Sequence, residues 1–312
     1  MRAVTIHDGE IRVQDRPDPT PGPSEVLVRV HAAGLNGADM MQRRGRYPAP
    51  PGAPKDIPGL ELAGAVVARA SGAERFAEGD RVMGIVSGGG QAELAVVDER
   101  TLIPVPENLS WVEAGGVPEV FTTAHDAVFT QAELQSGEHL LVHGGAGGVG
   151  TAAIQLGHAA GARVTATVRN PALRDAVAAL GAEVVAPEGF GEHGPFDVIL
   201  ELVGAPNLAE DLSALDTHGR ITVIGIGAGA KGELNLAQLM AKRARIHGSM
   251  LRARSVPDKA LTARAVERSV LPLLVAGTVR VLIADTYPLA EAEAAYDHFA
   301  AGGKLGKIIL VT

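Results

Sequence analysis

The amino-acid sequence predicts an α/β protein in which a doubly wound parallel sheet is joined to a smaller β-rich domain, a partly open barrel. Three observations predict this fold class. From about residue 116, apolar strand-like runs alternate with amphipathic helical segments, which is typical of a parallel sheet covered on both faces. Before that point, short β-runs are separated by Pro and Gly. The glycine-rich segment HGGAGGVG, residues 143–150, follows one apolar run and opens a helical segment.

The first domain is expected over residues 1–115. Its strand-like runs are short and carry turn signals between them, which favours the partly open barrel. Two Pro-rich segments, 17–25 and 46–59, each lie between strand-like runs, so loops bordering a cleft are favoured over disordered linkers. The expected strands lie within residues 3–13, 24–34, 64–70, 79–86 and 91–105.

The second domain is expected over residues 116–275 and carries the alternating pattern. A third segment, residues 276–312, is expected to return to the first domain and complete it with a strand in 279–289, a helix in 290–302 and a strand in 307–312. Strands of the second domain are expected in 139–145, 162–168, 182–187, 196–204, 219–227 and 244–250, and helices in 151–161, 171–181, 207–219 and 257–276.

Composition excludes several classes of protein. A chain of 312 residues exceeds the size at which a single hydrophobic core stops growing, so about two domains are expected. No apolar run approaches the length of a membrane helix, and Met1 leads directly into a strand-like run without the pattern of a signal peptide, so we expect a cytoplasmic location and no membrane partner. The net charge of −8 and the lack of a long basic block argue against nucleic acid as a partner.

The glycine-rich segment carries the strongest local chemistry. Gly145, Gly147 and Gly150 satisfy G-x-G-x-x-G between a strand and a helix, where glycines let the backbone turn tightly and approach a pyrophosphate at the helix N-terminus. The sequence therefore predicts a Rossmann dinucleotide-binding domain. The alternative is that the glycines only shape a sharp turn, and the extra Gly144 and Gly148 fit either interpretation. Cofactor contacts are expected from Gly145, Ala146, Gly147, Gly148, Val149 and Gly150.

The choice of nicotinamide nucleotide should be determined after the second strand of this domain. NAD binders place an Asp or Glu there on the ribose 2′-hydroxyl, whereas this sequence has Arg169 and Asn170. Arg offers a planar fork of charge-assisted donors to a 2′-phosphate, so NADPH is the expected cofactor. The alternative is that Arg169 is a solvated loop residue.

Several stretches together resemble a known family, the zinc-independent quinone oxidoreductases of the medium-chain dehydrogenase/reductase superfamily, particularly the branch similar to the p53-inducible quinone oxidoreductase. The resemblance implies a GroES-like catalytic domain, a Rossmann domain with six strands, a quinone site in the cleft between them and commonly a homodimer. It spans nearly the whole chain and rests on GLNGADMMQRRGRYPAPPG, IPGLELAG, GDRVMGIV, VPEVFTTAHDAVF, HGGAGGVGTAAIQL, GSMLRARS and GKIILVT.

The resemblance also bears on metal. Where zinc-dependent members of the superfamily hold their catalytic metal, this sequence has Asn36 and Leu60, and an amide oxygen with a leucine makes no catalytic zinc site. Because the chain has no Cys, a four-thiolate structural zinc site is impossible. We therefore expect an enzyme that works without metal.

Functional residues can be carried over where the motifs match. The resemblance implies that Asn36, Asp39 and Tyr47 belong to a catalytic cleft motif and that Thr123 approaches the nicotinamide end of the cofactor. Two departures stand out: Gly37 occupies a position where this branch often has Arg, and the short stretch after the third Rossmann strand lacks a tyrosine that assists the grip on the adenosine phosphate. Backbone bordering the cofactor is implied at Val203, Gly204, Gly225 and Leu251.

The first mechanistic hypothesis is that Asn36 donates a hydrogen bond to a substrate carbonyl as charge develops there, with Tyr47 as a second donor or as a wall of the pocket. Each residue has a simpler alternative. In these alternatives, Asn36 only caps local backbone, Asp39 only orients the loop or caps the helix that starts near it, and Tyr47 only packs against the Pro-rich loop.

Four further residues are left open. Glu119 either caps the following helix or shapes the cleft. His143 is interpreted as a packed or polar histidine rather than an acid-base group, because it has no visible partner in the sequence. Arg252 and Arg254 are interpreted as solvated, with binding of cofactor phosphate as the alternative.

Three classes of function fit the sequence. The first is NADPH:quinone oxidoreduction. The second is NADPH-dependent reduction of the double bond of an enone, enal or enoyl thioester, which leaves a carbanion-like carbon and should depend more on a positioned proton donor such as Tyr47. The third is a non-catalytic role, which tight NADPH binding without turnover would support.

Overall fold

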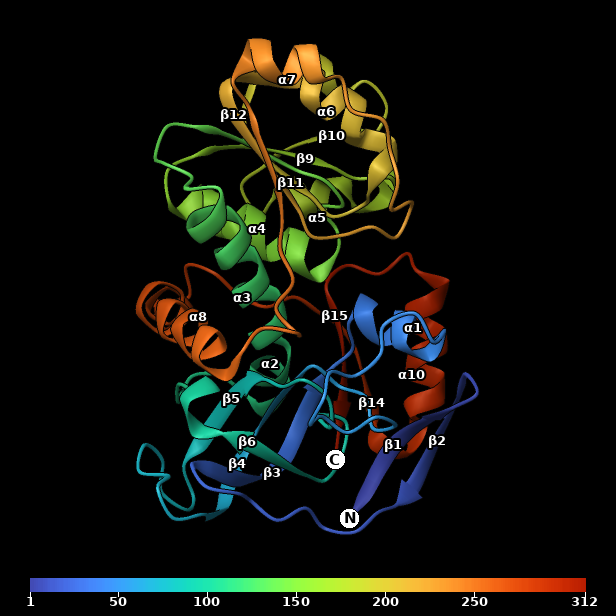
Figure 1. Ribbon diagram of the computed structural model, residues 1–312, viewed down its shortest axis with the longest axis vertical. Helices are drawn as coiled ribbons and strands as arrows, with labels where there is room; N and C mark the ends of the chain where they lie inside the picture. The colour runs from blue at the N-terminus through green and yellow to red at the C-terminus, as the bar shows by residue number, and fades with distance from the viewer. The chain divides into compact units, whose positions relative to one another are not determined.

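The computed structural model describes residues 1–312, and the chain divides into two compact units (Figure 1). Unit 1 comprises Met1–Thr122, Leu251–Ala276 and Val281–Thr312, and unit 2 comprises Thr123–Met250 and Gly277–Arg280. No helix in the chain combines the length and apolar character needed to cross a lipid bilayer.

The sequence places residues 251–275 in the second domain, and the structure corrects this assignment. The segment Leu251–Ala276 belongs to unit 1 because its helix α8 (Val256–Ser269) bonds to that unit. Arg264 donates to the carbonyl oxygen of Leu102, and Glu267 pairs with Arg75 at 2.8 Å. The expected long helix is also interrupted, since α9 (Leu271–Val275) starts separately with Pro272 in its first turn.

Unit 2 is built on a six-stranded sheet in which every recorded strand pair is parallel, in the order β10-β9-β8-β11-β12-β13. Figure 1 shows α4 and α5 on one side of this sheet and α6 and α7 on the other, so the predicted doubly wound architecture is confirmed. The strands are β8 (His139–Val142), β9 (Arg163–Thr167), β10 (Glu183–Val185), β11 (Phe196–Glu201), β12 (Leu215–Val223) and β13 (Arg245–Gly248), and the helices are α4 (Gly148–Ala159), α5 (Arg174–Ala178), α6 (Leu208–Ala214) and α7 (Leu236–Lys242).

The core of unit 2 explains both the predicted strands and two boundaries that the sequence missed. All four residues of β8 are buried, and apolar side chains from β8, β11, α6 and β12 pack into one cluster. The expected helix 207–219 ends at Ala214, because Leu215 is buried in that cluster and begins β12. Helix α7 was not expected, since most of its residues face solvent.

Unit 1 contains a mixed sheet in the order β14-β15-β3-β4-β5-β7, with β6 also paired to β3. A separate antiparallel hairpin, β1 with β2, packs with α1 and α10 around Tyr296 in a second apolar cluster. The strands are β1 (Arg2–His7), β2 (Glu10–Asp15), β3 (Glu25–Gly34), β4 (Glu61–Arg69), β5 (Arg81–Ile85), β6 (Leu94–Asp98), β7 (Leu102–Pro104), β14 (Ile283–Pro288) and β15 (Lys307–Val311), and the remaining helices are α1 (Gly37–Arg43), α2 (Trp111–Gly116), α3 (Pro118–His125) and α10 (Ala292–Ala301).

The C-terminal strand β15 lies next to the edge strand β14 of the unit 1 sheet and pairs antiparallel with β3 and parallel with β14. Its first residue, Lys307, is 2% exposed, so its ammonium group has left water. That group donates to Glu61 Oε1 at 2.6 Å, to Asn36 Oδ1 at 2.6 Å and to the carbonyl oxygen of Leu35 at 2.8 Å. Because an ammonium has three N–H donors, this arrangement satisfies it completely.

Lys307→Met should lower the free energy of unfolding by about 3–5 kcal/mol, because it leaves the buried Glu61 carboxylate without its countercharge. Urea denaturation measures the change. Lys304→Met is the matched control, since Lys304 is only partly buried and its ammonium bonds to a single carbonyl oxygen, that of Gly306. The double variant Lys307→Met/Glu61→Gln should be more stable than Lys307→Met alone; an equal or greater loss would show that the uncompensated charge is not the cause.

Candidate functional site

The first group of candidate residues lies in unit 1 around the Lys307–Glu61 ion pair. Glu61 opens β4 and is fully buried, and Asn36 follows the end of β3. Glu61 Oε1 accepts from Lys307, and its other oxygen, Oε2, accepts the backbone N–H of Glu119 at 2.8 Å. The sequence analysis did not single out Glu61 or Lys307. The available signal was a lone charge at the start of an apolar run, in ELAG and in KIILV.

Asn36 is held in one orientation by this pair. Its Oδ1 accepts from Lys307, while its Nδ2 donates to Glu61 Oε1 at 2.9 Å and to the carbonyl oxygen of Gly34 at 3.3 Å. The amide oxygen is therefore committed to Lys307. The Asn36 N–H that donates to the Gly34 carbonyl makes the longer of the two bonds. A bound substrate carbonyl could therefore replace the Gly34 carbonyl as its acceptor with the smaller loss of hydrogen-bond energy.

Asp39 is fully buried and serves the backbone around Asn36. Its Oδ2 accepts the N–H of Asn36 at 2.8 Å, and its Oδ1 accepts the N–H of Gly59 at 3.2 Å. Burial raises the pKa of this carboxyl to about 6, although the two backbone bonds and Lys307 oppose the shift. Both oxygens are occupied by the protein, so the geometry favours the role of bracing the loop and the start of α1 over contact with a ligand.

Tyr47 is half-buried and rests against Arg252. The guanidinium carbon of Arg252 lies 4.9 Å from the centre of the Tyr47 ring, and Nη1 of Arg252 donates to the Tyr47 carbonyl oxygen at 2.9 Å. The Tyr47 hydroxyl makes no hydrogen bond within the chain. Burial, followed by the nearby Glu119 carboxyl, raises the pKa of Tyr47, so the phenol stays protonated at neutral pH.

Arg252 is 4% exposed and not solvated, which corrects the preferred interpretation of the sequence. Besides Tyr47 it donates to Gln42 Oε1 at 2.8 Å and to the Ser87 carbonyl oxygen at 2.9 Å. All these acceptors belong to unit 1, so Arg252 fixes the loop that carries Tyr47. A single sequence gives no signal that one arginine of LRARS is buried.

Glu119 lies in the first turn of α3 and is half-buried. Its side chain accepts no hydrogen bond from the chain, in contrast to Glu61. Burial, followed by the negative charge of Glu61, raises the pKa of Glu119 to about 8 despite the opposing charge of Lys307. Glu119 is therefore a protonated carboxyl group at neutral pH and can act as a hydrogen-bond donor.

The second group of candidate residues lies in unit 2, where the glycine-rich loop joins β8 to α4. A Cβ on Gly150 would lie 2.4 Å from the carbonyl oxygen of Gly144, and a Cβ on Gly145 would lie 3.0 Å from Ala166 Cβ. The loop therefore folds as a tight turn that only glycine permits, at the N-terminus of a 12-residue helix. This geometry fits the pyrophosphate of a dinucleotide. Gly147 is exposed, and Ala146, Gly148 and Val149 are half-buried, so this backbone is accessible.

The other predicted contacts in unit 2 follow the carboxyl ends of its strands. Val203 and Gly204 come after β11, and Gly225 comes after β12. A Cβ on Gly225 would lie 2.0 Å from the carbonyl oxygen of Leu202, so these two turns pack backbone against backbone. In an open parallel sheet this edge is where ligands bind.

Arg169 follows β9 at the same edge of the sheet. It is exposed and takes part in no ion pair or hydrogen bond within the chain. The neighbouring Asn170 is used locally, because its Oδ1 accepts the N–H of Ala172 at 3.1 Å. The guanidinium is therefore available to an anion.

The two remaining predicted contacts are buried. Thr123 is 7% exposed and is the first residue of unit 2, within α3. Leu251 is also 7% exposed but belongs to unit 1, where it lines a cavity of about 20 Å³ together with Thr122 and Lys259. The structure therefore groups Leu251 with residues of unit 1 and not with the strand ends of unit 2.

Comparison with known proteins also gives two domains, although the second match extends past the boundary at Leu251. Residues 22–107 match the alcohol dehydrogenase GroES-like domain, and residues 148–265 match the zinc-binding dehydrogenase family. A solved structure of an alcohol dehydrogenase superfamily protein from Novosphingobium aromaticivorans superposes with a TM-score of 0.88 at 30% identity, covering 100% of this chain and 99% of that one. The predicted pairing of a GroES-like and a Rossmann domain is thus confirmed.

Two relatives indicate the chemistry found in this family. The polyketide synthase GfsB of Streptomyces halstedii is 32% identical over 292 residues, which cover 92% of this chain and 5% of that protein. The quinone oxidoreductase of Homo sapiens is 31% identical over 331 residues, which cover 100% of this chain and 98% of that protein. The chain therefore belongs to the medium-chain dehydrogenase/reductase superfamily, among the quinone oxidoreductases and their relatives.

Proposed function

We propose that this chain is a metal-independent oxidoreductase that transfers a hydride from NADPH to a quinone. The observation that carries the proposal is the polar site of unit 1, which offers proton-bearing donors and no set of metal ligands. Tyr47 and Glu119 are both held in their protonated forms, and the Asn36 amide is oriented by Lys307. Such a site suits an acceptor whose oxygen gains negative charge.

Absence of a catalytic metal is part of the proposal. Leu60, at one of the positions where zinc-dependent relatives would place a ligand, is 2% exposed and apolar. Lys307 occupies the oxygen of Asn36 and so competes with any cation for it. A positive ammonium 2.6 Å from both Asn36 and Glu61 repels a metal ion from this position.

The choice of NADPH rests on Arg169. No carboxylate follows β9, and the exposed guanidinium at that point has no partner within the chain. A 2′-phosphate would gain charge-assisted hydrogen bonds there, whereas the 2′-hydroxyl of NADH would not need them.

The residues of unit 1 would act on the acceptor as hydride arrives. Bound NADPH supplies the hydride, which carries both electrons. The Asn36 Nδ2–H that bonds to the Gly34 carbonyl and the Tyr47 hydroxyl would donate hydrogen bonds to the acceptor oxygen. This oxygen would take one proton from Glu119 or from water. The balance is quinone, NADPH and one proton giving hydroquinone and NADP⁺. Asp39, Lys307 and Arg252 are positioning residues in this scheme.

A second candidate function is NADPH-dependent reduction of an enone, enal or enoyl-thioester double bond. The specific observation in its favour is that Tyr47 and Glu119, two potential proton donors of unit 1, lie close enough for the Glu119 carboxyl to contribute to the raised pKa of Tyr47. A carbanion-like carbon needs such a donor more than a quinone does. The similarity to a polyketide synthase agrees with this alternative.

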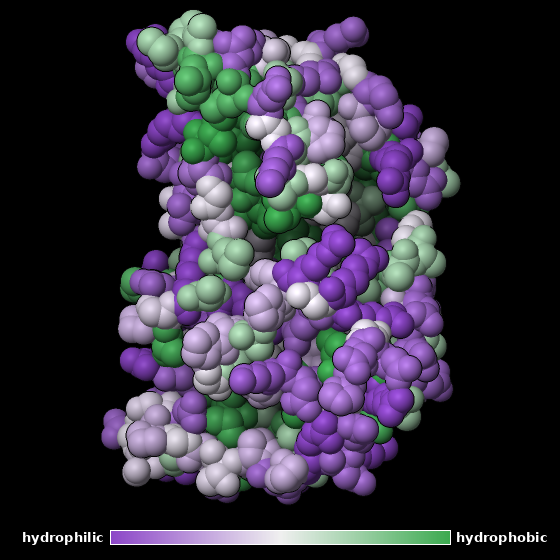
Figure 2. All heavy atoms as spheres, turned by 45° about the vertical axis from the view of Figure 1, so that its right-hand side comes forward, coloured by the Kyte–Doolittle hydropathy of each residue, from purple (hydrophilic) through white to green (hydrophobic).

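A homodimer is also proposed, and a cytoplasmic location stays a prediction. The surface of unit 2 exposes large hydrophobic side chains around α7, where Leu236 is 63% exposed and Met240 is 75% exposed. Figure 2 shows hydrophobic residues gathering on the surface of unit 2. Strand β13 nearby has a neighbour on one side only, so a second copy could cover this surface.

The proposed activity is tested by NADPH oxidation with metal-free purified protein. An ortho-quinone, an enone and an enoyl thioester are compared in parallel, and we expect turnover of the quinone with no stimulation by added zinc. Turnover of the double-bond substrates alone would reject the quinone and favour the second candidate, in which Tyr47→Phe should lower kcat by roughly 10²-fold. Binding of NADPH without turnover of any acceptor would reject both.

Arg169→Glu should weaken NADPH binding by roughly 10 to 100-fold without weakening NADH binding, because a carboxylate repels the 2′-phosphate but can accept a hydrogen bond from the ribose 2′-hydroxyl of NADH. Fluorescence titration of each nucleotide gives both dissociation constants. Arg163→Glu is the matched control, since Arg163 is also exposed but begins β9 at the opposite end and already pairs with Glu183 at 3.2 Å. An unchanged preference for NADPH over NADH would show that Arg169 does not read the phosphate.

Activity should fall as pH rises through about 8, because Glu119 then loses the proton that it would donate to the acceptor. The measurement is kcat/KM from pH 6 to 10. Glu119→Gln should lower kcat/KM at pH 7 and abolish that step in the profile. Glu107→Gln, at an exposed position, serves as control and should keep the wild-type profile. A wild-type step that persists in Glu119→Gln would assign the titration to another group.

A further inference from the structure

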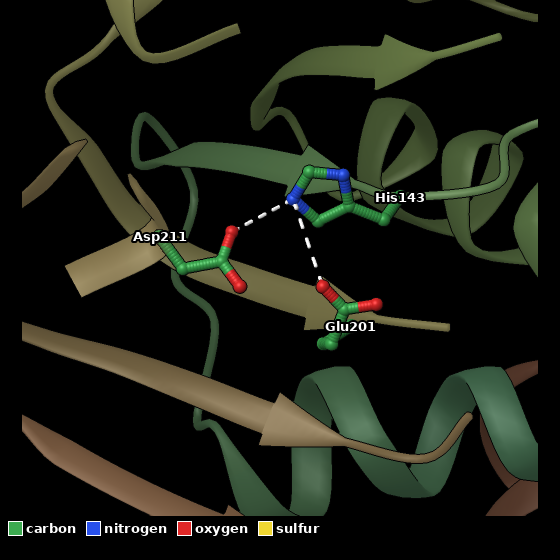
Figure 3. Close-up of side chains that lie close together, drawn as sticks. All are labelled: His143, Glu201 and Asp211. Atoms are coloured by element: carbon green, nitrogen blue, oxygen red, sulfur yellow. Dashed lines mark hydrogen bonds and ion pairs between the residues drawn. The ribbon is translucent and has the colours of Figure 1, made fainter. Parts of the chain in front are cut away.

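Unit 2 contains a cluster of three titratable side chains that no step above uses: His143, Glu201 and Asp211 (Figure 3). They are 1%, 3% and 0% exposed, respectively, at their side chains. His143 directly follows β8, Glu201 is the last residue of β11, and Asp211 lies in α6. Figure 3 shows both carboxyl groups on the Nε2 side of the His143 ring. We call these residues the buried triad.

Glu201 shapes the turn that follows β11. Its Oε1 accepts the backbone N–H of Val203 and, at 2.7 Å, that of Gly204. Its Oε2 accepts from Asn207 Nδ2 at 2.9 Å. One carboxylate therefore holds three donors of the turn, and this turn contains two of the residues expected to border the cofactor.

His143 makes the corresponding connections for the glycine-rich loop. Its Nδ1 lies 3.1 Å from Thr167 Oγ1, and the same hydroxyl oxygen accepts the N–H of Gly144 at 3.3 Å. These contacts tie the first residue of the loop to the end of β9. The histidine is thus part of the support of the loop rather than a packed residue without a polar role.

Asp211 links the two halves of the triad. Its Oδ1 lies 2.8 Å from His143 Nε2, and Nε2 lies 3.9 Å from Glu201 Oε2. The other Asp211 oxygen, Oδ2, is buried with no partner within the chain. A buried carboxylate oxygen without a donor is costly to ionise, so this environment favours the protonated form of Asp211 more than water does. Burial accordingly raises the pKa of Asp211 to about 6, and the charge of Glu201 adds to the shift.

We propose that the buried triad positions the cofactor by fixing the glycine-rich loop and the turn at Val203 and Gly204 in one arrangement. Its members touch no cofactor atom and act through the backbone N–H groups that they hold. This inference rests on the proposed binding of NADPH by unit 2, and the ligand is the pyrophosphate-containing dinucleotide.

Unit 2 offers a matched control for each part of the test. His139 begins β8 at the opposite end of the same strand, is 8% exposed, and bonds through Nε2 to Thr165 Oγ1 at 2.9 Å. The pair His139–Thr165 thus repeats the chemistry of His143–Thr167 two residues back along β9, away from the loop. Thr165→Val and Thr167→Val remove one buried hydroxyl each at nearly constant volume.

The experiment is NADPH titration of purified full-length variants, monitored by fluorescence, with thermal melting to record stability. Thr167→Val and His143→Asn should raise the dissociation constant for NADPH by about tenfold, whereas Thr165→Val and His139→Asn should change it by less than about twofold. Asp211→Asn keeps an acceptor for His143 and should bind NADPH nearly as wild type, while Asp211→Leu should not.

Three outcomes would overturn the inference. Equal weakening by the His139 and His143 variants would show a general loss of stability, and unchanged binding in all variants would show no positioning. A melting temperature that falls with chelator and is restored by zinc in the wild type, but not in Asp211→Asn, would assign the triad to a metal.

Failure of the proposed function is distinguishable from failure of this inference. If the wild type binds neither nucleotide, the proposed function falls while the triad is still tested by amide hydrogen exchange of the free protein. Exchange at Gly144, Val203 and Gly204 should then be faster by about tenfold in Asp211→Leu than in Asp211→Asn. Equal protection in the two variants would reject the triad as the support of these turns.

Discussion

The buried ammonium of Lys307 is the group on which the polar site of unit 1 depends. It lies at the start of the C-terminal strand β15, and through Glu61 and Asn36 it connects β15 to β4 and to the loop after β3. Without it, Glu61 would be an uncompensated buried charge, and the Asn36 amide would have no preferred orientation. One contact between residues 246 positions apart therefore stabilises the sheet and also aims the amide that we propose to meet the acceptor.

Two glutamates of unit 1 show how environment divides roles between identical side chains. Glu61 accepts hydrogen bonds from Lys307, from the Asn36 amide and from the Glu119 backbone. Glu119, whose backbone N–H donates to Glu61, accepts no hydrogen bond at its own side chain. Burial and the negative charge of Glu61 raise its pKa to about 8. Glu61 thus supports the surrounding backbone and side chains, and we propose that Glu119 supplies a proton at neutral pH.

In unit 2, buried polar side chains also hold the backbone, here at the carboxyl ends of the strands. Backbone geometry there is imposed by glycines whose neighbours leave no room for a Cβ, as at Gly150 and Gly225. Beneath that backbone lies the buried triad, in which Glu201 holds the N–H of Val203 and Gly204 while His143 reaches Thr167. The edge of the sheet that we propose to bind the cofactor therefore rests on buried polar side chains, which accounts for a histidine and two carboxyl groups beneath it.

By itself, the sequence determined the fold class, the position of the glycine-rich loop and the place of Arg169, because these depend on local periodicity and on glycines between a strand and a helix. It also supplied the candidates Asn36, Asp39 and Tyr47 through resemblance. Tertiary structure alone decided that the segment Leu251–Ala276 joins unit 1, that Arg252 is buried, and that Asp39 braces backbone. It also revealed Lys307, Glu61 and the buried triad. Their partners lie up to 272 residues apart, and a long-range contact between buried polar groups leaves no periodic signal in one sequence.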